Sequence, residues 1–194
     1  MPAKKILVFL GQEDSHTFCG DLSKSYADGA RASGAEVKIV QIGDLKFDPL
    51  LHKGYKEIQA LEPDLLMVQE AFKWADHIAL FYPMWWSSMP AILKGFFDRM
   101  FLPGFAYHFN HNGMGWTKLL KGRSAEVFIT MDSWPMLQRF LFGDSTNEIG
   151  RAILGFAGIH PVHIKKIGIV KDMSDQKKIA VAKQIFLAGN KAGR

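Results

Sequence analysis

Five short apolar runs, separated by longer amphipathic segments, constrain the fold of this 194-residue chain more than any other feature of its sequence. The runs are rich in β-branched and aromatic residues, which is typical of strands, and the segments between them have helical apolar spacing. A chain that alternates in this way folds into βα units on a parallel sheet. The predicted strands are Lys5–Leu10, Glu36–Ile42, His77–Tyr82, Ser124–Thr130 and Pro161–Ile169.

The segments between these strands carry the periodicity of helices that bury one face. The predicted helices are Phe18–Ser33, Asp64–Ala75, Pro90–Phe101, Asn147–Ala157 and Ser174–Ala188. The first, third and fourth strand runs are apolar almost throughout, which indicates a sheet covered by helices on both faces. The predicted fold class is therefore α/β, with a five-stranded parallel sheet between two helical layers. No linker or internal repeat interrupts the chain, so residues 1–194 are predicted to form a single domain.

Two connections are long for a compact domain, residues 43–63 and 102–123. Each is either a surface for a ligand or a second subunit, or a loop that merely wraps the protein. The second contains His108 and His111, at a spacing that two metal ligands can adopt, but no carboxylate or cysteine motif accompanies them. We therefore predict no metal site.

Composition excludes several classes of protein. Lys and Arg number 24 against 19 Asp and Glu, giving a net charge of +5, but the basic pairs are isolated, so nucleic acid is not an expected partner. A single cysteine, Cys19, excludes an intrachain disulfide, indicates a reducing compartment, and is expected to be a small buried residue rather than a nucleophile. No apolar stretch reaches the length of a membrane span. We therefore expect a cytoplasmic protein.

The carboxyl ends of the predicted strands are the expected ligand-binding edge of such a sheet. The first segment at this edge, residues 11–19, carries small and hydroxylated residues immediately before a helix. Ser15 or Thr17 either caps that helix or donates a hydrogen bond to a phosphate at its N-terminus. The segment lacks both the Gly-x-Gly-x-x-Gly and the Walker lysine motifs, which disfavours nucleotide binding of those two types.

The second segment at this edge contains adjacent tryptophans, Trp85 and Trp86, between Pro83 and Pro90. The two prolines stiffen the connection between strand and helix. Two neighbouring indoles on one extended loop cannot both face the core. Either one of them is presented to a planar ligand, or both pack beneath a neighbouring loop.

These residues also carry a family resemblance. The strings Pro83-Met-Trp-Trp, Pro90-Ala-Ile-Leu-Lys-Gly-Phe-Phe-Asp-Arg and Gly104-Phe-Ala-Tyr107 run in order over about forty residues, with weaker agreement elsewhere. They resemble the flavodoxin-like NAD(P)H:quinone oxidoreductases, a group that includes mammalian quinone reductase and the bacterial modulator-of-drug-activity and potassium-efflux ancillary proteins. The resemblance implies a flavodoxin-like sheet, a bound flavin, NAD(P)H as co-substrate and a homodimer.

The resemblance places the flavin on three loops and the substrate on aromatic residues. The flavin positions are Gln12, His16, Thr17 and Phe18 for the phosphate, Pro83, Met84, Trp85, Trp86 and Ser87 along the ring, and Thr130, Met131, Asp132 and Ser133 in the third loop. The substrate positions are Tyr107, Phe109 and Trp134. Gln12 stands where a histidine is frequent in the family, so a possible cation is absent. FAD is favoured over the alternative FMN because the connection between the second and third strands is long.

The third loop departs from the family. Many relatives continue with Thr-Gly-Gly, whereas this chain reads Thr130 followed by Met-Asp-Ser-Trp-Pro, so close approach of the backbone to a flavin is harder. A carboxylate facing the flavin would disfavour its anionic reduced form, so Asp132 is expected to turn away. The tyrosine and histidine that assist hydride transfer in mammalian enzymes are missing, and Phe142 stands near the histidine position. No acid–base catalyst is therefore named.

The resulting prediction is a flavin-dependent oxidoreductase that passes hydride from NAD(P)H to quinones or similar small aromatic acceptors. One alternative is a flavin-binding regulatory protein that acts on a partner such as a transporter, because the third loop is altered. Another is a flavodoxin-type electron carrier, which the basic charge balance and the long aromatic loop disfavour. The choice between NADH and NADPH stays open.

Overall fold

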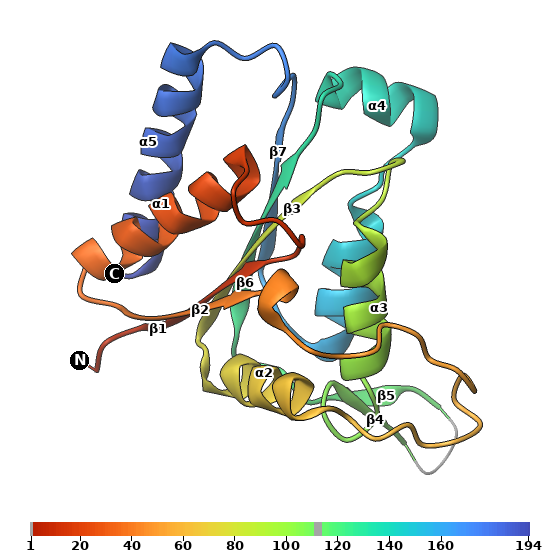
Figure 1. Ribbon diagram of the computed structural model, residues 1–194. Helices are drawn as coiled ribbons and strands as arrows, with labels where there is room; N and C mark the ends of the chain where they lie inside the picture. Colours follow the sequence, from red (N-terminus) through yellow and green to blue (C-terminus); the bar gives the residue numbers. More distant parts are fainter. Residues whose placement is uncertain (1, 111–113) are drawn as a thin grey trace.

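The computed structural model describes residues 2–110 and 114–194, and its centre is a five-stranded parallel sheet. The strands are β1 (Lys5–Leu10), β2 (Glu36–Gln41), β3 (His77–Pro83), β6 (Ser124–Thr130) and β7 (Val162–Ile167). They lie in the order β2-β1-β3-β6-β7, and every neighbouring pair is parallel (Figure 1). This confirms the predicted flavodoxin-like architecture. The last strand is shorter than predicted, since it begins after Pro161 and ends before Gly168.

Helices cover both faces of this sheet. One layer holds α1 (Phe18–Ala32) and α5 (Asp175–Ala192), and the other holds α2 (Pro63–Trp74), α3 (Ala91–Met100) and the helix η2 (Glu148–Gly155) (Figure 1). Each of the five predicted helices is present, but η2 is a π-helix rather than an α-helix. Within the described part of the chain, no helix is long and apolar enough to cross a membrane.

Four short elements were missed by the sequence analysis. They are the 3-10 turn η1 (Ile42–Asp44), the hairpin strands β4 (Tyr107–Phe109) and β5 (Trp116–Lys118), and the helix α4 (Pro135–Phe142). The hairpin strands have three residues each, too few to show an alternating pattern. Helix α4 has only eight residues, fewer than any of the helices that the apolar spacing predicted.

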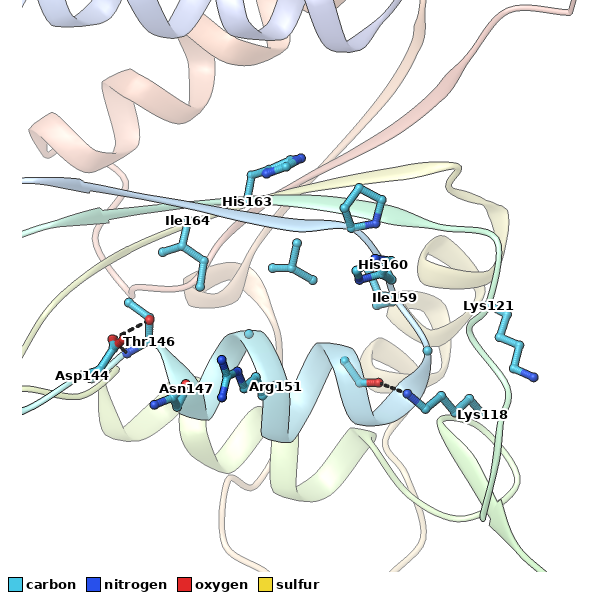
Figure 2. A pocket seen from close by; sticks show the side chains of 15 residues that line it. Lys118, Lys121, Asp144, Thr146, Asn147, Arg151, Ile159, His160, His163 and Ile164 are labelled. Carbon is cyan, nitrogen blue, oxygen red and sulfur yellow. Dashed lines mark hydrogen bonds between the residues drawn. The ribbon is translucent and has the colours of Figure 1, made fainter. Parts of the chain in front are cut away.

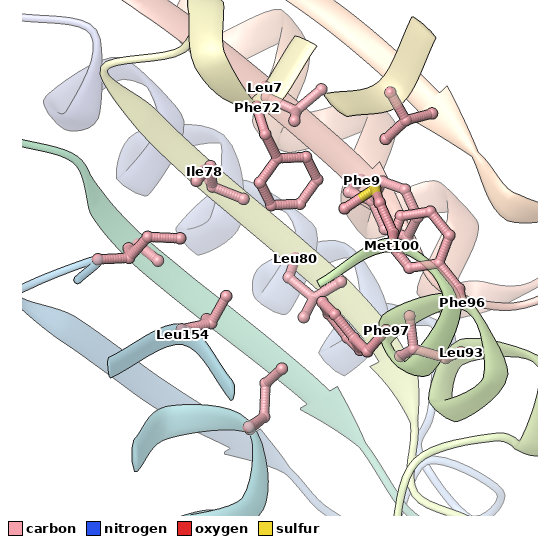
Figure 3. Close-up of a cluster of buried hydrophobic side chains, with 14 of the residues drawn as sticks. Leu7, Phe9, Phe72, Ile78, Leu80, Leu93, Phe96, Phe97, Met100 and Leu154 are labelled. Carbon is pink, nitrogen blue, oxygen red and sulfur yellow. The ribbon is translucent and has the colours of Figure 1, made fainter. Parts of the chain in front are cut away.

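Two apolar clusters hold the helices on the sheet. The larger lies beneath α2, α3 and η2, and Figure 3 shows Phe9 and Phe72 packed there beside Phe96. The Phe9 and Phe96 ring centroids are 4.8 Å apart. The smaller cluster lies beneath α1 and α5, where Phe81 and Phe128 stack at 4.7 Å. Because consecutive residues of β1 and β3 face different clusters, both sides of these strands are apolar.

The long connection of residues 43–63 is attached to α3 by Arg99. This side chain is fully buried. Its guanidinium donates to the Glu62 carboxylate and to the Ala60 carbonyl at 2.9 Å, and also to the Asp48 carbonyl. Burial alone would raise the pKa of Glu62, but hydrogen bonds from the Asp48 N–H and from Arg99 hold that pKa below its ordinary value. A buried cation with these partners fixes the course of the loop.

Candidate functional site

A cavity lies at the carboxyl edge of the sheet, where the segments after β1, β3 and β6 converge. These strands are neighbours. The connection after β1 leads to β2 on one side, and the connection after β3 leads to β6 on the other, which opens a crevice between the two adjacent loops. We call this cavity the cradle. Its volume is about 280 Å³, and it is lined by Gln12, Thr17, Phe18, Cys19, Pro83, Met84, Trp85, Thr130, Met131, Asp132 and Val170.

Most of the predicted flavin positions therefore meet in one place. Of those predicted positions, His16, Trp86, Ser87 and Ser133 lie on the same loops but do not line the cavity. Sequence reasoning missed two lining residues, Cys19 and Val170. Cys19 could have been found, because it follows Phe18 in the first turn of α1. Val170 lies in the segment after β7, for which no sequence signal pointed to a site.

The first loop presents the N-terminus of α1 to the cradle. Thr17 is the N-cap, and its hydroxyl oxygen accepts a hydrogen bond from the Gly20 N–H at 3.1 Å. A Cβ at Gly20 would lie 2.1 Å from the Ser15 carbonyl oxygen, so only glycine allows the loop to fold this closely onto the helix. The next two backbone N–H groups, of Phe18 and Cys19, have no hydrogen-bond partner within the part of the chain that the structure describes. Together with the helix dipole they form a site for an anion.

Two side chains brace this loop from within. The buried Gln12 amide donates to the Asp14 carbonyl and to the Thr17 hydroxyl. The Asp14 carboxylate accepts a hydrogen bond from the His16 N–H at 2.7 Å, and the His16 imidazole points into solvent. The loop is thus formed in advance, but a phosphate that used the His16 N–H would have to displace the exposed Asp14 carboxylate.

The second loop makes a tight turn that exposes both tryptophans. Trp85 and Ser88 exchange two backbone hydrogen bonds of 2.9 Å across it. The two residues between them, Trp86 and Ser87, have φ of +49° and +61°, which is left-handed backbone that favours glycine or asparagine. Trp85 is half-exposed against the cradle and Trp86 is fully exposed. Neither indole is packed beneath a neighbouring loop, and presentation of one of them to a planar ligand stays a prediction.

The third loop is tied to its neighbours by backbone hydrogen bonds. The Met84 N–H donates to the Thr130 carbonyl at 2.7 Å, and the Met131 N–H donates to the Ile167 carbonyl at 2.9 Å. The Asp132 carboxylate accepts from the backbone N–H of Lys171 at 3.0 Å. The Asp132 carboxylate is therefore engaged by the segment after β7, although the residue also lines the cradle. Its orientation relative to a flavin stays a prediction.

Cys19 lies in the floor of the cradle and is almost fully buried. Burial raises the pKa of its thiol to about 12, and a hydrogen bond with Thr130 opposes this only in part. The sulfur is therefore protonated at neutral pH and is not a nucleophile. Cys19 is therefore a small buried residue, as the sequence analysis expects.

The predicted substrate residues lie apart from the cradle. Tyr107 and Phe109 form strand β4 after the C-terminal end of α3, whereas the cradle lies beside the N-terminal end of that helix (Figure 1). Tyr107 contacts Phe109 and Phe156, each at 5.0 Å between ring centroids. It lines a separate pocket of about 380 Å³ that also includes Tyr55. One copy of the chain therefore does not bring these rings to the predicted flavin position.

Trp134, the third predicted substrate residue, is the exposed N-cap residue of α4, immediately after the third loop. Phe142, near the expected histidine position, is exposed at the other end of α4 and has no group that transfers a proton. His111 lies outside the described residues. Among those that are described, no group of three or more His, Cys, Asp or Glu residues is arranged to hold a metal.

A larger cavity than the cradle, of about 790 Å³, lies between η2 and the edge strand β7 (Figure 2). The charged residues in its lining are mostly basic, as Lys118, Lys121 and Arg151 stand beside Asp144. The Lys118 ammonium group donates to the Gly155 carbonyl at the end of η2 at 2.8 Å. None of the residues predicted from the sequence lines this cavity, so it is distinct from the cradle.

Comparisons with known proteins agree with the fold. The family described as having a flavodoxin-like fold matches residues 4–188. An uncharacterized NAD(P)H oxidoreductase of Haemophilus influenzae is 26% identical over 91% of this chain and 89% of its own length. The ribosyldihydronicotinamide dehydrogenase [quinone] of Mus musculus is 28% identical over 67% of this chain, and the match spans 64% of that enzyme, less than two thirds of its length.

Solved structures show the same fold. An NAD(P)H:quinone oxidoreductase from Methanothermobacter marburgensis superposes with a TM-score of 0.82 at 20% identity, covering 98% of this chain and 99% of that one. An FMN-dependent NADH-azoreductase from Bacillus anthracis, solved in complex with FMN, gives a TM-score of 0.73 at 15% identity and covers 98% of this chain and 100% of its own. At these identities the likeness establishes the arrangement of the chain alone.

Proposed function

Because the chain belongs to the Flavodoxin_2 family, we propose that it is an NAD(P)H-dependent flavoenzyme that reduces quinones or similar small aromatic acceptors. The observation that carries this proposal is the cradle, where an anion site at the start of α1 and a half-exposed tryptophan converge on one edge of the sheet. The names of the relatives from Haemophilus influenzae and Mus musculus support NAD(P)H as reductant and a quinone as acceptor.

The residues of the cradle fit a flavin. The N–H groups of Phe18 and Cys19 would hold a phosphate, and Thr17 fixes their direction as the helix cap. Trp85 and Met84 would form the wall against the ring. The azoreductase that was solved in complex with FMN supports FMN as the cofactor. The long connection of residues 43–63 supports FAD. We retain FAD as the proposed cofactor, with FMN as the alternative.

The flavin, when bound, supplies the ability to accept a hydride from the nicotinamide and to pass it to the acceptor. Overall, NAD(P)H loses a hydride, and the quinone gains that hydride and one proton from solvent to become the hydroquinone. The chain itself contributes position and exclusion of water. Asp132 is the only acidic residue lining the described cavity, and its carboxylate is engaged by the Lys171 N–H. No side chain of the cradle is therefore assigned the proton transfer.

The proposal includes a homodimer. If Tyr107 and Phe109 close over an acceptor, their position beyond α3 means that they serve the cradle of a second copy. Sedimentation is expected to give twice the chain mass of 21.8 kDa. A fully active monomer would contradict this part of the proposal.

The enzymatic proposal is tested with the purified protein alone. We expect a yellow protein whose released cofactor has the mass of FAD or FMN, and which oxidises NADH or NADPH when menadione is added. A Trp85→Ala variant should lose most bound flavin, whereas Trp116→Ala, which removes an indole stacked on Phe156 outside the cradle, should retain it. A colourless protein that takes up no flavin and oxidises neither nucleotide would overturn the proposal.

A second candidate function is a flavin-binding regulatory protein. The observation in its favour is the third loop, which lacks the glycine pair and is braced by the segment after β7 rather than left free to approach a flavin. The menadione assay separates the two functions. A protein that retains flavin but shows no turnover with several quinones would favour the regulatory role.

A further inference from the structure

Helix α4 carries a convex apolar surface next to the cradle. Met136, Leu137, Phe140 and Leu141 are all exposed, and positions i, i+1, i+4 and i+5 of a helix share one side. We call these four residues the α4 face. The opposite side of the helix is attached to the protein by Gln138, which is 3% exposed and accepts a hydrogen bond from the Lys166 ammonium group at 2.9 Å. The α4 face therefore points away from the core.

The helix lies between two segments that form the cradle. Its N-cap residue, Trp134, comes two residues after Asp132 in the third loop. Just beyond its C-terminal end, the Ser145 hydroxyl lies 4.0 Å from the sulfur of Met84 in the second loop. Figure 1 shows α4 at the outer corner of the molecule, by the carboxyl ends of β3 and β6. A surface that contacts the α4 face would therefore lie beside the opening of the cradle.

We propose that the α4 face docks on an anionic lipid bilayer, and that the acceptor reduced at the neighbouring cradle is a quinone dissolved in that bilayer. The second half of this inference rests on the proposed function. Exposed Met, Phe and Leu on one side of a helix, with Trp at its end, match the apolar side of helices that lie in a membrane interface, and Arg139 adds one cation on another side. Trp134 and the fully exposed Trp86 are residues that favour the boundary between lipid and water.

Charge supports a lipid surface. The chain carries a net charge of +5, and Arg139, Lys166 and Lys171 lie on or beside α4. Asp144 lies close to Arg139 and Lys166, and the Asp132 carboxylate accepts from the Lys171 N–H, so these two carboxylates offset part of that charge. Anionic headgroups attract the remainder. A second copy would instead bring two surfaces of the same positive sign together, which opposes self-association at this site.

Area gives a second reason to prefer lipid over a second copy. Four side chains of this size, each between 51% and 86% exposed, offer on the order of 500 Å². A stable protein interface needs about 800 Å² from each partner. A bilayer has no such requirement, because a convex helix can enter it from one side. A patch of this size is comparable to the largest apolar patch on a typical monomeric protein, and such patches are often functional.

The proposal predicts how quinone reduction depends on the bilayer. A quinone with a long prenyl tail partitions into lipid, so an enzyme held at the surface meets it there, whereas menadione reaches the cradle from water. The electron balance is the same for both quinones, since NAD(P)H supplies the hydride and solvent supplies the one proton that completes the hydroquinone. Substitution in the α4 face should therefore affect reduction of the lipid-dissolved quinone and leave menadione reduction unaltered.

The experiment measures co-sedimentation of the full chain with two kinds of vesicle, phosphatidylcholine alone and equal parts of phosphatidylcholine and phosphatidylglycerol. The test variant is Met136→Ser with Phe140→Ser, and the control is Ile58→Ser with Ile179→Ser, which removes two exposed apolar side chains on other elements. Each preparation is also assayed with menadione in solution and with a polyprenyl benzoquinone in the vesicles. Circular dichroism checks that every variant is folded, and sedimentation gives the oligomeric state.

We expect the wild-type protein and the control to bind the anionic vesicles, with weaker binding in high salt and to phosphatidylcholine alone. The test variant should bind about tenfold less and lose vesicle quinone reduction by a similar factor. Failure of the wild-type protein to bind, equal binding by the test variant, or dissociation of an oligomer by the test substitutions would each overturn the inference. Vesicle binding without any menadione reduction would instead contradict the proposed function and the claim that the acceptor is a quinone in the bilayer. The claim that the α4 face docks on lipid would then still stand.

Discussion

Replacement of Arg99 by methionine tests the claim that this side chain holds residues 43–63 on the fold. Methionine fills most of the same volume but removes the hydrogen bonds to Glu62, Ala60 and Asp48. Breaking a buried ion pair costs about 3–5 kcal/mol when the remaining charge stays buried. The Glu62 side chain is 28% exposed and regains some water, so the lower end of that range applies. The free energy of unfolding should therefore fall by about 3 kcal/mol.

Urea unfolding, followed by circular dichroism, measures this change, and Lys94→Met provides the matched control. Lys94 is also a cation on α3, but its pair with Asp98 is nearly half exposed, so its loss should cost at most about 0.5 kcal/mol. An Arg99→Met variant that loses no more stability than the control would show that the buried cation does not hold the loop.

The contribution of the Arg99–Glu62 ion pair to the free energy of unfolding should fall at acidic pH. The pKa of Glu62 is held below its ordinary value of 4.5 in the folded protein, so its stabilisation is complete above 4.5 and is lost as pH falls through the lower folded value. In Arg99→Met, burial still raises the pKa but the guanidinium no longer opposes it. The difference in stability between wild type and variant should therefore narrow below pH 4.5, and a constant difference down to pH 3 would refute the assigned ion pair.

Three smaller predictions concern the cradle. Thr17→Ala removes the helix cap and should cost about 1 kcal/mol in urea unfolding and weaken flavin retention, whereas Thr17→Ser should do neither; equal retention by all three proteins would contradict the anion site. Ser87→Gly relieves a left-handed residue and should stabilise the protein by about 1 kcal/mol, seen as a higher Tm, while a lower Tm would show that the turn is unstrained. Because burial raises the pKa of Cys19 to about 12, the native thiol should resist iodoacetamide at pH 8 and react only after unfolding in urea; rapid native labelling would refute its burial.

The sheet was predictable from sequence because a strand buried on both faces is a continuous apolar run, which can be recognised without knowing the rest of the fold. Residues 78–82 of β3 alternate between the two clusters, so each of them, such as Leu80 and Phe81, is hydrophobic whichever face of the sheet it lies on. The ends of β7 were less predictable. It is an edge strand whose residues are mostly accessible, and the segment that follows leaves the sheet at Gly168 and Ile169.

Lining residues in all three loops of the cradle could be predicted, but the conformation of the third loop could not. Thr17 and Trp85 belong to local patterns, a helix cap and a stiff loop between prolines. The third loop instead depends on pairing between distant segments, since Met131 and Asp132 bond with Ile167 and Lys171. A glycine pair would have been recognisable in the sequence. Hydrogen bonds to a segment far away in the chain have no local sequence pattern.

The distance of Tyr107 from the cradle could have been predicted from the length of the helix that precedes it. Helix α3 begins directly after the loop of Trp85, and its ten residues rise about 15 Å away from it. Whatever follows α3 must therefore emerge near the opposite end of the sheet, however well its aromatic residues match those of a substrate site. If both sets of rings act on one acceptor, they must come from different copies of the chain. A mixed dimer of one Trp85→Ala chain and one Tyr107→Ala chain should then retain one intact site, whereas the two homodimers should retain none, and equal activity of all three would show that the rings do not share a substrate.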